Sequence, residues 1–363
     1  MAEVKNIREI WIDYAKVIGI ILVIAGHLTF ADNGAKRFIF AFHMPLFFFI
    51  SGYLHRSGDS ISAGVKKDVQ RLLLPYVYFY LISYVLWFAA NFLKHRHDGL
   101  NTVIHDGIVK PMLGMLLGVG YETDISLSVN HPVWFLVGLF VVKLIYTGLE
   151  KLCKGNKLYI ATGLAVLTGI MVWLKLLGTD LWFSVDSAIL ALPFLFAGVL
   201  VKVYGNIKLW FKNNLLNLFY FAVLAFATAG VIYFNGGSDV NGTNWGNNLA
   251  LFYIGGLTGS FMIFAISFVL GQYPNKFILF VSANTLVLLG TQVEVKSIAV
   301  SGLNAVGYKL PEKLDGTQVV VITLAVLILS LPVMYIIDKY FPFLSGGNKK
   351  GKPTLIVAGK NEL

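Results

Sequence analysis

The sequence predicts an all-α polytopic membrane protein with about ten transmembrane helices. Hydrophobic residues make up 57% of the 363 residues and charged residues only 13%, whereas soluble domains are about half apolar and about one quarter charged. Nearly uncharged stretches of about 18 to 22 residues recur along the chain, and a helix of that length crosses a hydrocarbon core roughly 30 Å thick. These stretches are too long and too continuously apolar for the strands of a barrel, so helices must satisfy the backbone in lipid.

The apolar stretches define the spans. We expect ten, at residues 14–31, 38–54, 75–93, 132–149, 158–178, 182–201, 215–234, 248–270, 277–297 and 318–338. A further segment, VIHDGIVKPMLGMLLGVG at 103–120, is a candidate re-entrant or interfacial piece, because His105, Asp106 and Lys110 oppose a full crossing. The polar start MAEVKNIREIWID leads directly into the first span with no small-residue cleavage site, which indicates an uncleaved helix.

The placement of positive charge predicts the orientation. If the N-terminus is cytoplasmic, the loops and ends on that side hold most of the 29 Lys and Arg, so both termini are predicted to face the cytoplasm. The net charge of +10 then reflects this asymmetry, and no nucleic-acid partner is expected. We expect residues 1–340 to form a single integral-membrane domain and residues 341–363 to form a cytoplasmic polar tail.

Two histidines lie within apolar spans. Lys16 and His27 are eleven positions apart, which places them about 20° apart around a helix and roughly 16 Å apart along its axis. Asp13 lies one turn before Lys16 and can pair with it. His43 is on the second span, which returns after the short loop ADNGAKR and must pack beside the first. Ionisable residues inside a membrane usually mark a functional site, although a hydrogen bond between helices is the alternative for a single histidine.

Other polar side chains fall at the same outer depth. They are Asp186 in the sixth span, Gln292 and Glu294 in the ninth, and Trp134 at the edge of the fourth. Each has a structural alternative, which is an interhelical hydrogen bond for the polar residues and an interfacial anchor for the tryptophan. Their convergence in one layer favours a substrate site. The triplet at Asn241 also fits a glycosylation sequon, which is a weak signal.

A basic cluster lies on the cytoplasmic side, between the second and third spans. The segment HRSGDSISAGVKKDVQRLLLPY contains Lys66, Lys67 and Arg71. These residues predict either a basic segment on anionic lipid or a phosphate-binding mouth open to the cytosol. The pair Ser51-Gly52, at the inner end of the second span, allows close approach of a backbone or ligand, and it is equally consistent with a helix terminus.

Four motifs in order carry a resemblance to a known family. They are the Lys-x10-His of the first span, FHMPLFFFISGYL in the second, RLLLPY before the third and VWFL in the fourth. With ten spans, this order resembles the membrane acyltransferase family 3, and within it the fucose 4-O-acetylase-like proteins. The resemblance covers roughly residues 8–340 and is densest before residue 140.

The resemblance implies an acyl-CoA-dependent O-acyltransferase. Such proteins take an acyl group, usually acetyl, from acyl-coenzyme A in the cytosol and place it on a hydroxyl of a cell-envelope saccharide. The basic residue and the essential histidine of the family fall on Lys16 and His27. Its serine-glycine pair falls on Ser51 and Gly52, and the basic residue before its LPY element falls on Arg71.

The expected site has a donor part and a reacting part. Acetyl-CoA would serve as the acyl donor, with Lys16, Arg71 and either Lys66 or Lys67 holding its phosphates. The roughly 16 Å from Lys16 to His27 is comparable with the length of an extended phosphopantetheine arm, so the thioester would reach His27. No metal is expected.

His27 is the expected general base. A neutral imidazole would take the proton of a sugar hydroxyl as its oxygen attacks the thioester, and an acyl-histidine intermediate is the less favoured variant. His43 or a backbone amide would stabilise the oxyanion, and Trp134 would stack on the sugar. The sequence departs from the family at Gln292, where many relatives have a histidine; Gln292 could still orient a substrate by hydrogen bonding.

Two other functions compete with acyl transfer. A transporter or flippase of a lipid-linked saccharide would also use a polar layer in a ten-span bundle, but it predicts inverted repeats with broken spans, and none is found in the sequence. A scaffold subunit is the third possibility. For an acyltransferase the expected partners are acyl-CoA, a saccharide acceptor, either free or lipid-linked, and membrane lipids. The expected location is a bacterial cytoplasmic membrane, with the catalytic layer toward the extracytoplasmic side.

Overall fold

The chain folds as a bundle of helices. The computed structural model describes residues 8–28, 33–58, 61–95, 104–120 and 125–346. Its elements in chain order are α1 (Ile10–Gly26), α2 (Asn33–Tyr53), α3 (Ile61–Asp68), η1 (Val69–Leu73), α4 (Leu74–His95), η2 (His105–Val109), α6 (Lys110–Leu117), η3 (His131–Val133), α7 (Trp134–Leu152), α8 (Lys157–Leu176), α9 (Val185–Tyr204), α10 (Ile207–Trp210), α11 (Asn214–Asn235), η4 (Asn241–Thr243), α12 (Leu249–Leu270), α13 (Lys276–Ala283), α14 (Thr285–Ala305), α15 (Gly316–Tyr340) and η5 (Pro342–Ser345). No strand occurs among these described residues, which confirms the predicted all-α class.

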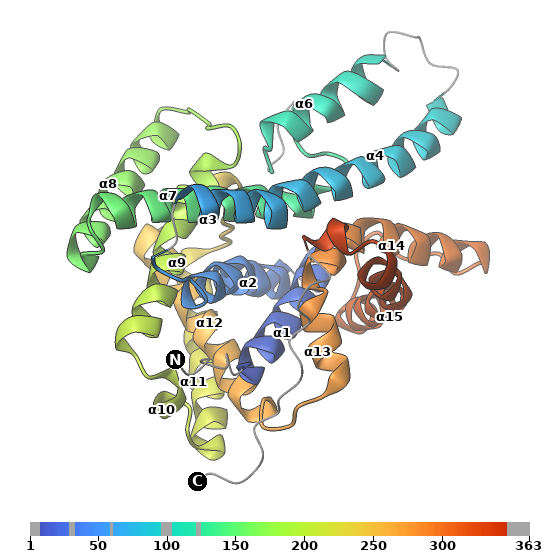
Figure 1. Ribbon diagram of the computed structural model, residues 1–363. Coiled ribbons are helices and arrows are strands. Elements are labelled where there is room, and N and C mark those ends of the chain that lie inside the picture. The colour runs from blue at the N-terminus through green and yellow to red at the C-terminus, as the bar shows by residue number, and fades with distance from the viewer. Residues whose placement is uncertain (1–7, 29–32, 59–60, 96–103, 121–124, 347–363) are drawn as a thin grey trace.

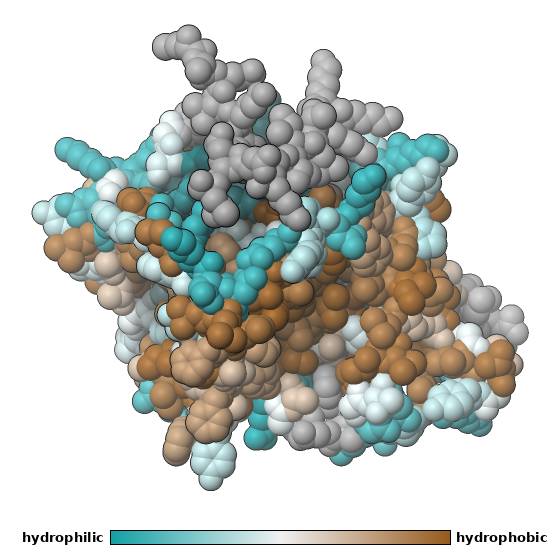
Figure 2. Space-filling model, turned by 90° about the horizontal axis from the view of Figure 1, so that it is seen from below, coloured by the Kyte–Doolittle hydropathy of each residue, from teal (hydrophilic) through white to brown (hydrophobic). Residues whose placement is uncertain are grey.

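The helices form a membrane protein. Eight helical stretches of the described residues are long and apolar enough to cross a membrane. Figure 2 shows apolar side chains over the middle of one face, with polar side chains toward both edges. The histidine-bearing helices α1 and α2 are not among the eight: α1 has 17 residues, and α2 begins with the polar Asn33, Lys36 and Arg37. The count of ten spans and the positions of the termini stay predictions.

Helix starts follow local capping rules. The side-chain oxygens of four asparagines accept backbone N–H groups at the first turns of α8, α11, α12 and α13; these residues are Asn156, Asn213, Asn248 and Asn275. Asp315 forms a capping box with Gln318 at the start of α15. Such caps satisfy N–H groups that have no partner within the helix, so the turn residues between apolar stretches set where the helices begin.

The helix α2 runs through the centre of the bundle, between α1, α9 and α12 (Figure 1). Its backbone touches that of α9: a Cβ added to Gly52 would lie 1.8 Å from the Leu195 carbonyl oxygen, and one added to Gly198 would lie 2.1 Å from the Phe49 carbonyl oxygen. Small residues allow this approach between helices in a membrane. The sequence left open which group approaches Gly52 closely. The structure shows that this group is the backbone of α9.

The segment predicted to be re-entrant or interfacial packs along α4 as η2 and α6 (Figure 1). Three tyrosines of α4, one turn apart, donate hydrogen bonds to its carbonyl groups: Tyr76 to Met115 at 2.6 Å, Tyr80 to Pro111 at 2.9 Å and Tyr84 to Gly107 at 3.1 Å. The helical part has too few residues to cross a bilayer at 1.5 Å per residue.

Two predicted spans have different bounds in the structure. The helix α1 covers Ile10–Gly26, so His27 is its C-cap residue and does not lie inside the helix, as the expected span at 14–31 had it. The expected span at 277–297 is two helices, α13 and α14, because Asn284 leaves the helical conformation between them. The predicted tail begins with η5, which packs against α4, α14 and α15; residues 347–363 lie outside the described part of the chain.

Candidate functional site

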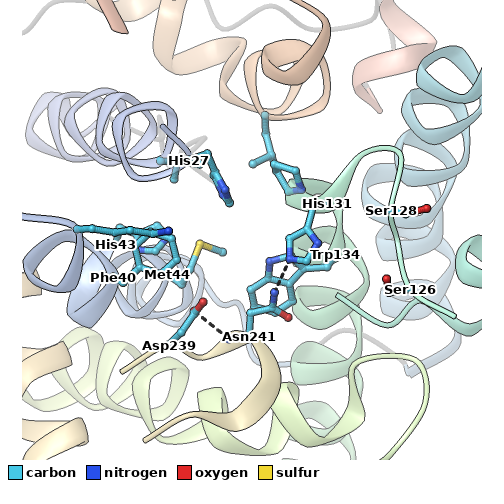
Figure 3. Close-up of a pocket in the computed structure, with 14 residues that line it drawn as sticks. His27, Phe40, His43, Met44, Ser126, Ser128, His131, Trp134, Asp239 and Asn241 are labelled. Carbon is cyan, nitrogen blue, oxygen red and sulfur yellow. Dashed lines mark hydrogen bonds between the residues drawn. The ribbon is translucent and has the colours of Figure 1, made fainter. Parts of the chain in front are cut away.

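A polar cavity, which we call the histidine cavity, lies where the ends of several helices meet. It has a volume of about 490 Å³ and lies between the end of α1, the first half of α2, η3 and the loop before α12 (Figure 3). Its lining residues are Val23, His27, Lys36, Phe40, His43, Met44, Ser126, Ser128, His131, Pro132, Trp134, Asp239, Asn241 and Leu289. Three histidines from separate elements therefore share one cavity.

His27 lines the cavity from the end of α1. Its ring meets Phe40 of α2 edge to face, with 6.0 Å between ring centroids. Phe40 can lie beside His27 because residue 26, just before His27, is a glycine. A Cβ on Gly26 would lie 3.0 Å from the Phe40 ring. Among the described residues, no hydrogen bond restrains the ring nitrogens of His27. The imidazole can therefore turn toward a ligand in the cavity.

His43 has a fixed tautomer. The side chain is 2% exposed, and its Nδ1 lies 2.9 Å from the carbonyl oxygen of Ile39, one turn earlier on α2. A carbonyl oxygen only accepts hydrogen bonds, so the proton of the neutral ring is on Nδ1 and Nε2 carries the lone pair. A neutral His43 therefore offers an acceptor at Nε2. This geometry does not favour the oxyanion-donor role that we expected for it.

The loop between α11 and α12 contributes two residues that the sequence did not identify as site residues. Asn241 donates from Nδ2 to His131 Nε2 at 3.0 Å and to the Gly120 carbonyl oxygen at 2.8 Å. Asp239 accepts from the Asn241 backbone N–H at 3.0 Å. Burial raises the pKa of Asp239 to about 7. The sequence marked Asn241 only as a sequon, but its amide nitrogen is engaged within the fold.

Several predicted substrate residues do not line this cavity. Asp186 is buried at the start of α9, where it accepts the Ser187 backbone N–H at 2.7 Å. Gln292 is buried and donates weakly to the Leu289 carbonyl oxygen at 3.4 Å, and Glu294 also lies on α14 away from the lining. Gln292 and Glu294 were expected at the outer end of a span, but the break at Asn284 places these two residues near the middle of α14.

Trp134 does line the cavity, but its ring is largely enclosed. The side chain is 3% exposed, and the ring lies against Gly120, Gly138 and Phe135. Phe40 is half-buried, lines the same cavity and lies between the two histidines, with 4.8 Å between its centroid and that of His43. Phe40 is therefore the more accessible aromatic surface, although it was not among the predicted site residues.

A larger cavity, which we call the basic cavity, lies at the other end of α2. Its volume is about 1260 Å³. Seven Lys and Arg line it, together with two carboxylates; the cations are Arg56, Lys67, Arg71, Lys143, Lys151, Lys154 and Lys157. Asp68 pairs with Lys143, and Glu150 pairs with Lys157 and His55. The other five cations form no ion pair with a described residue. This cavity has the charge of a polyphosphate site.

The segment before Pro75 explains how Arg71 reaches the basic cavity. Proline has no N–H, so the Arg71 carbonyl loses its helical partner. The chain makes a π-turn, η1, in which the Leu74 N–H bonds to the Val69 carbonyl oxygen. Such turns are frequent at functional sites. Arg71, Lys67 and Ser51 all line the cavity, and the sequence analysis expected these three residues to bind the donor.

Lys16 does not line the basic cavity. It is half-buried on α1, and its Nζ donates to the Ser282 carbonyl oxygen at 2.8 Å. Asp13, its expected partner, instead accepts two hydrogen bonds from the guanidinium of Arg8, at 2.7 and 2.8 Å, and one from the Ser282 hydroxyl at 2.6 Å. Arg8 displaces Lys16 as the partner of Asp13 because its planar guanidinium matches a carboxylate. The structure thus separates Lys16 from the other predicted phosphate ligands.

The helices α2 and α7 connect the two cavities. On α2, Met44 lines the histidine cavity and Ser51 the basic cavity, a separation of about 10 Å at 1.5 Å per residue. Between them, Phe135 of α7 packs against Phe47 and Phe48, with centroid distances of 5.8 and 5.2 Å. Aromatic side chains therefore occupy the interval between the cavities.

Among the described residues, no group of three or more His, Cys, Asp and Glu could hold a metal.

Comparison with known proteins supplies the family. A family model described as an acyltransferase domain, acyltransferase family 3, matches residues 9–339. Over 100 residues the chain is 37% identical to nodulation protein NolL of Mesorhizobium japonicum, and this alignment covers 24% of the chain and 27% of that protein. The match thus spans about a quarter of the relative's length. No solved structure matches the chain.

Proposed function

The chain belongs to acyltransferase family 3, and we propose that it moves an acyl group, in the first instance acetyl, from cytosolic acyl-CoA across the membrane to a hydroxyl of a cell-envelope or exopolysaccharide sugar. One observation supports this proposal above the others. Two cavities lie at opposite ends of the same helix, α2: one has five cations with no ion pair to a described residue, and the other has three histidines. A donor with charged phosphates and a distant thioester needs both.

The basic cavity is the proposed donor site and would face the cytosol. Arg71 and Lys67 would bind phosphates, since neither has a carboxylate partner in the described part of the chain, which leaves a guanidinium and an ammonium available for a polyanion. Ser51 would lie beside the start of the pantetheine arm. The arm would run between α2 and α7, which requires Phe135 to move away from Phe47. Lys16 has no direct part in this binding.

The histidine cavity is the proposed reacting site, on the extracytoplasmic side. His27 would take the proton of the sugar hydroxyl while that oxygen forms a bond to the thioester carbonyl carbon. The carbon–sulfur bond then breaks, and the imidazolium returns the proton to the departing thiolate of CoA. His43 would accept a hydrogen bond at Nε2 from a second hydroxyl. Phe40 would lie against the apolar face of the sugar ring.

The test of this function measures free CoA released from acetyl-CoA by the detergent-purified chain. The release is measured with and without an envelope saccharide extract. We expect release that the saccharide stimulates and that His27→Ala abolishes while the protein stays folded. The matched control is His105→Ala, because His105 is exposed and remote from both cavities. Failure of the folded wild-type protein to release CoA from acetyl-CoA or succinyl-CoA would contradict acyl transfer.

A further inference from the structure

Lys296 is a cation inside a membrane helix, and its partner is unusual. It lies on α14, one of the eight helices able to cross a membrane, and its Nζ donates to the backbone carbonyl oxygen of His27 at 3.3 Å. No carboxylate among the described residues lies within ion-pair distance of it. An ammonium at membrane depth is costly and is usually retained for a function. Within the described part of the chain, its hydrogen bond goes to the residue proposed as the base.

The position of His27 explains what this bond can do. His27 is the C-cap of α1, with φ −87° and ψ 6°, and the next helix begins at Asn33. The last carbonyl groups of a helix have no partner within the helix. A lysine that donates to one of them satisfies it and also complements the negative end of the helix dipole. The bond therefore fixes the peptide that carries the His27 side chain.

The side chain of His27 has no comparable restraint. Among the described residues no hydrogen bond holds its ring, in contrast to His43, whose Nδ1 is bonded to Ile39. The orientation of the His27 imidazole thus depends on its backbone and on the Phe40 ring beside it. The backbone N–H of His27 bonds to the carbonyl oxygens of Val23 and Ile24 within α1, and Lys296 adds a bond from another helix to its carbonyl oxygen.

We infer that Lys296 is a positioning residue for His27, holding the end of α1 so that the imidazole faces the reacting centre. This inference rests on the proposed role of His27 as general base. Lys296 does not line the histidine cavity, so it acts through His27 and not on the substrate. A misplacement of a base by about 1 Å can reduce a rate about 100-fold. A loss of kcat up to this size is therefore expected when Lys296 is replaced.

The alternative is that Lys296 only stabilises the fold. The two roles differ in what they change. A structural cap would alter the unfolding temperature and the yield of folded protein, but the folded molecules would keep their turnover. A positioning residue would lower kcat in folded protein and leave the KM for acetyl-CoA unchanged, because the donor phosphates bind at the other end of α2.

The test measures CoA release from acetyl-CoA, with saturating saccharide extract, for the full chain and for K296M, K296R and K309M. Lys309 is an exposed lysine just after α14 and serves as the charge-removal control. We expect K296M to lose about 10- to 100-fold in kcat, with the donor KM within twofold of wild type. K296R should recover most of this loss, because a guanidinium can also reach the carbonyl, and K309M should behave as wild type.

The outcomes separate the inference from the function on which it rests. Wild-type kcat in K296M, or a loss of kcat that K296R does not recover in folded protein, would overturn the role of Lys296. If K296M does not fold, the kcat of K296R and K296Q decides by the same criteria. No CoA release by wild type, or an unchanged rate in His27→Ala, would instead reject the proposed function, whatever the Lys296 variants do.

Discussion

His43 donates from Nδ1 to the carbonyl oxygen of Ile39, one turn earlier on α2, at 2.9 Å. This bond leaves the lone pair of the neutral ring on Nε2, and His43 lines the histidine cavity. His43 is therefore suited to accept a hydrogen bond from a substrate hydroxyl and unsuited, while neutral, to donate one to an oxyanion.

The His43 geometry predicts different effects for two amide substitutions. His43→Asn can keep the bond to Ile39 but removes the atom at Nε2. We expect the KM for the saccharide to rise about tenfold or more, because the substrate loses one hydrogen bond. His43→Gln can place a carbonyl oxygen near the Nε2 position and should keep more affinity. Steady-state CoA release against saccharide concentration measures this, and equal KM values for the two variants would contradict the assignment.

The basic cavity predicts a donor-specific effect of Arg71. With Arg71→Ala, the KM for acetyl-CoA should rise about tenfold or more, because a charge-assisted hydrogen bond contributes about 1.5 to 3 kcal/mol. The KM for S-acetylpantetheine, which lacks the nucleotide phosphates, should not change. Lys276→Ala is the control, since Lys276 is exposed at the start of α13 and away from the cavity. An equal rise for both donors would argue against phosphate binding by Arg71.

Asp239 predicts a pH dependence of stability. Burial raises its pKa to about 7, above the ordinary value of about 3.9. Between about pH 4 and 7 the folded state therefore holds a proton that the unfolded state has released, so stability falls as the pH rises through this window. Asp239→Asn should remove this contribution, which makes the fall in unfolding temperature from pH 5 to pH 8 smaller than in wild type.

Thermal unfolding of the detergent-solubilised protein at pH 5 and pH 8 checks the Asp239 prediction. The control is Glu312→Gln, an exposed carboxylate outside the helices, which should leave the wild-type difference unchanged. A fall of the same size in Asp239→Asn and wild type would mean that Asp239 is ionised at both pH values.

The contact between α2 and α9 predicts a large penalty at Gly52. An alanine Cβ at this position would lie 1.8 Å from the Leu195 carbonyl oxygen, so the two backbones must separate. Overpacking of this kind costs about 1 to 3 kcal/mol, occasionally more. Gly52→Ala should lower the unfolding temperature, whereas Gly148→Ala should not, because a Cβ there meets open space on the exposed side of α7. Similar unfolding temperatures for the two variants would show that α9 shifts without cost.

Much of the fold could be predicted because it depends on local composition. Long apolar stretches form helices in lipid whatever their neighbours, so most expected spans match a helix within a few residues. The errors came from single residues that end a helix, at His27 and at Asn284. Those ends depend on cap conformations that hydropathy does not report.

The site could be predicted only in part. The structure brings some of the predicted residues together: His27 and His43 line one cavity, and Ser51, Lys67 and Arg71 line the other. Their roles stay predictions. Lys16, Asp186, Gln292 and Glu294 were assigned by their depth along a helix. Depth does not say which way a side chain faces, and none of the four lines either cavity.

By itself, the sequence determined the membrane class, the helical content, the motifs of an acyltransferase and the positive charge near Arg71. The tertiary structure decided which polar groups meet. It brought Asp239 and Asn241 from a distant loop to His131, assigned Gly52 to the contact with α9, and placed Lys296 on the carbonyl of His27. The physical reason is that apolar content specifies a helix locally, whereas the rotation and neighbours of each helix are fixed by packing with segments far away in the chain.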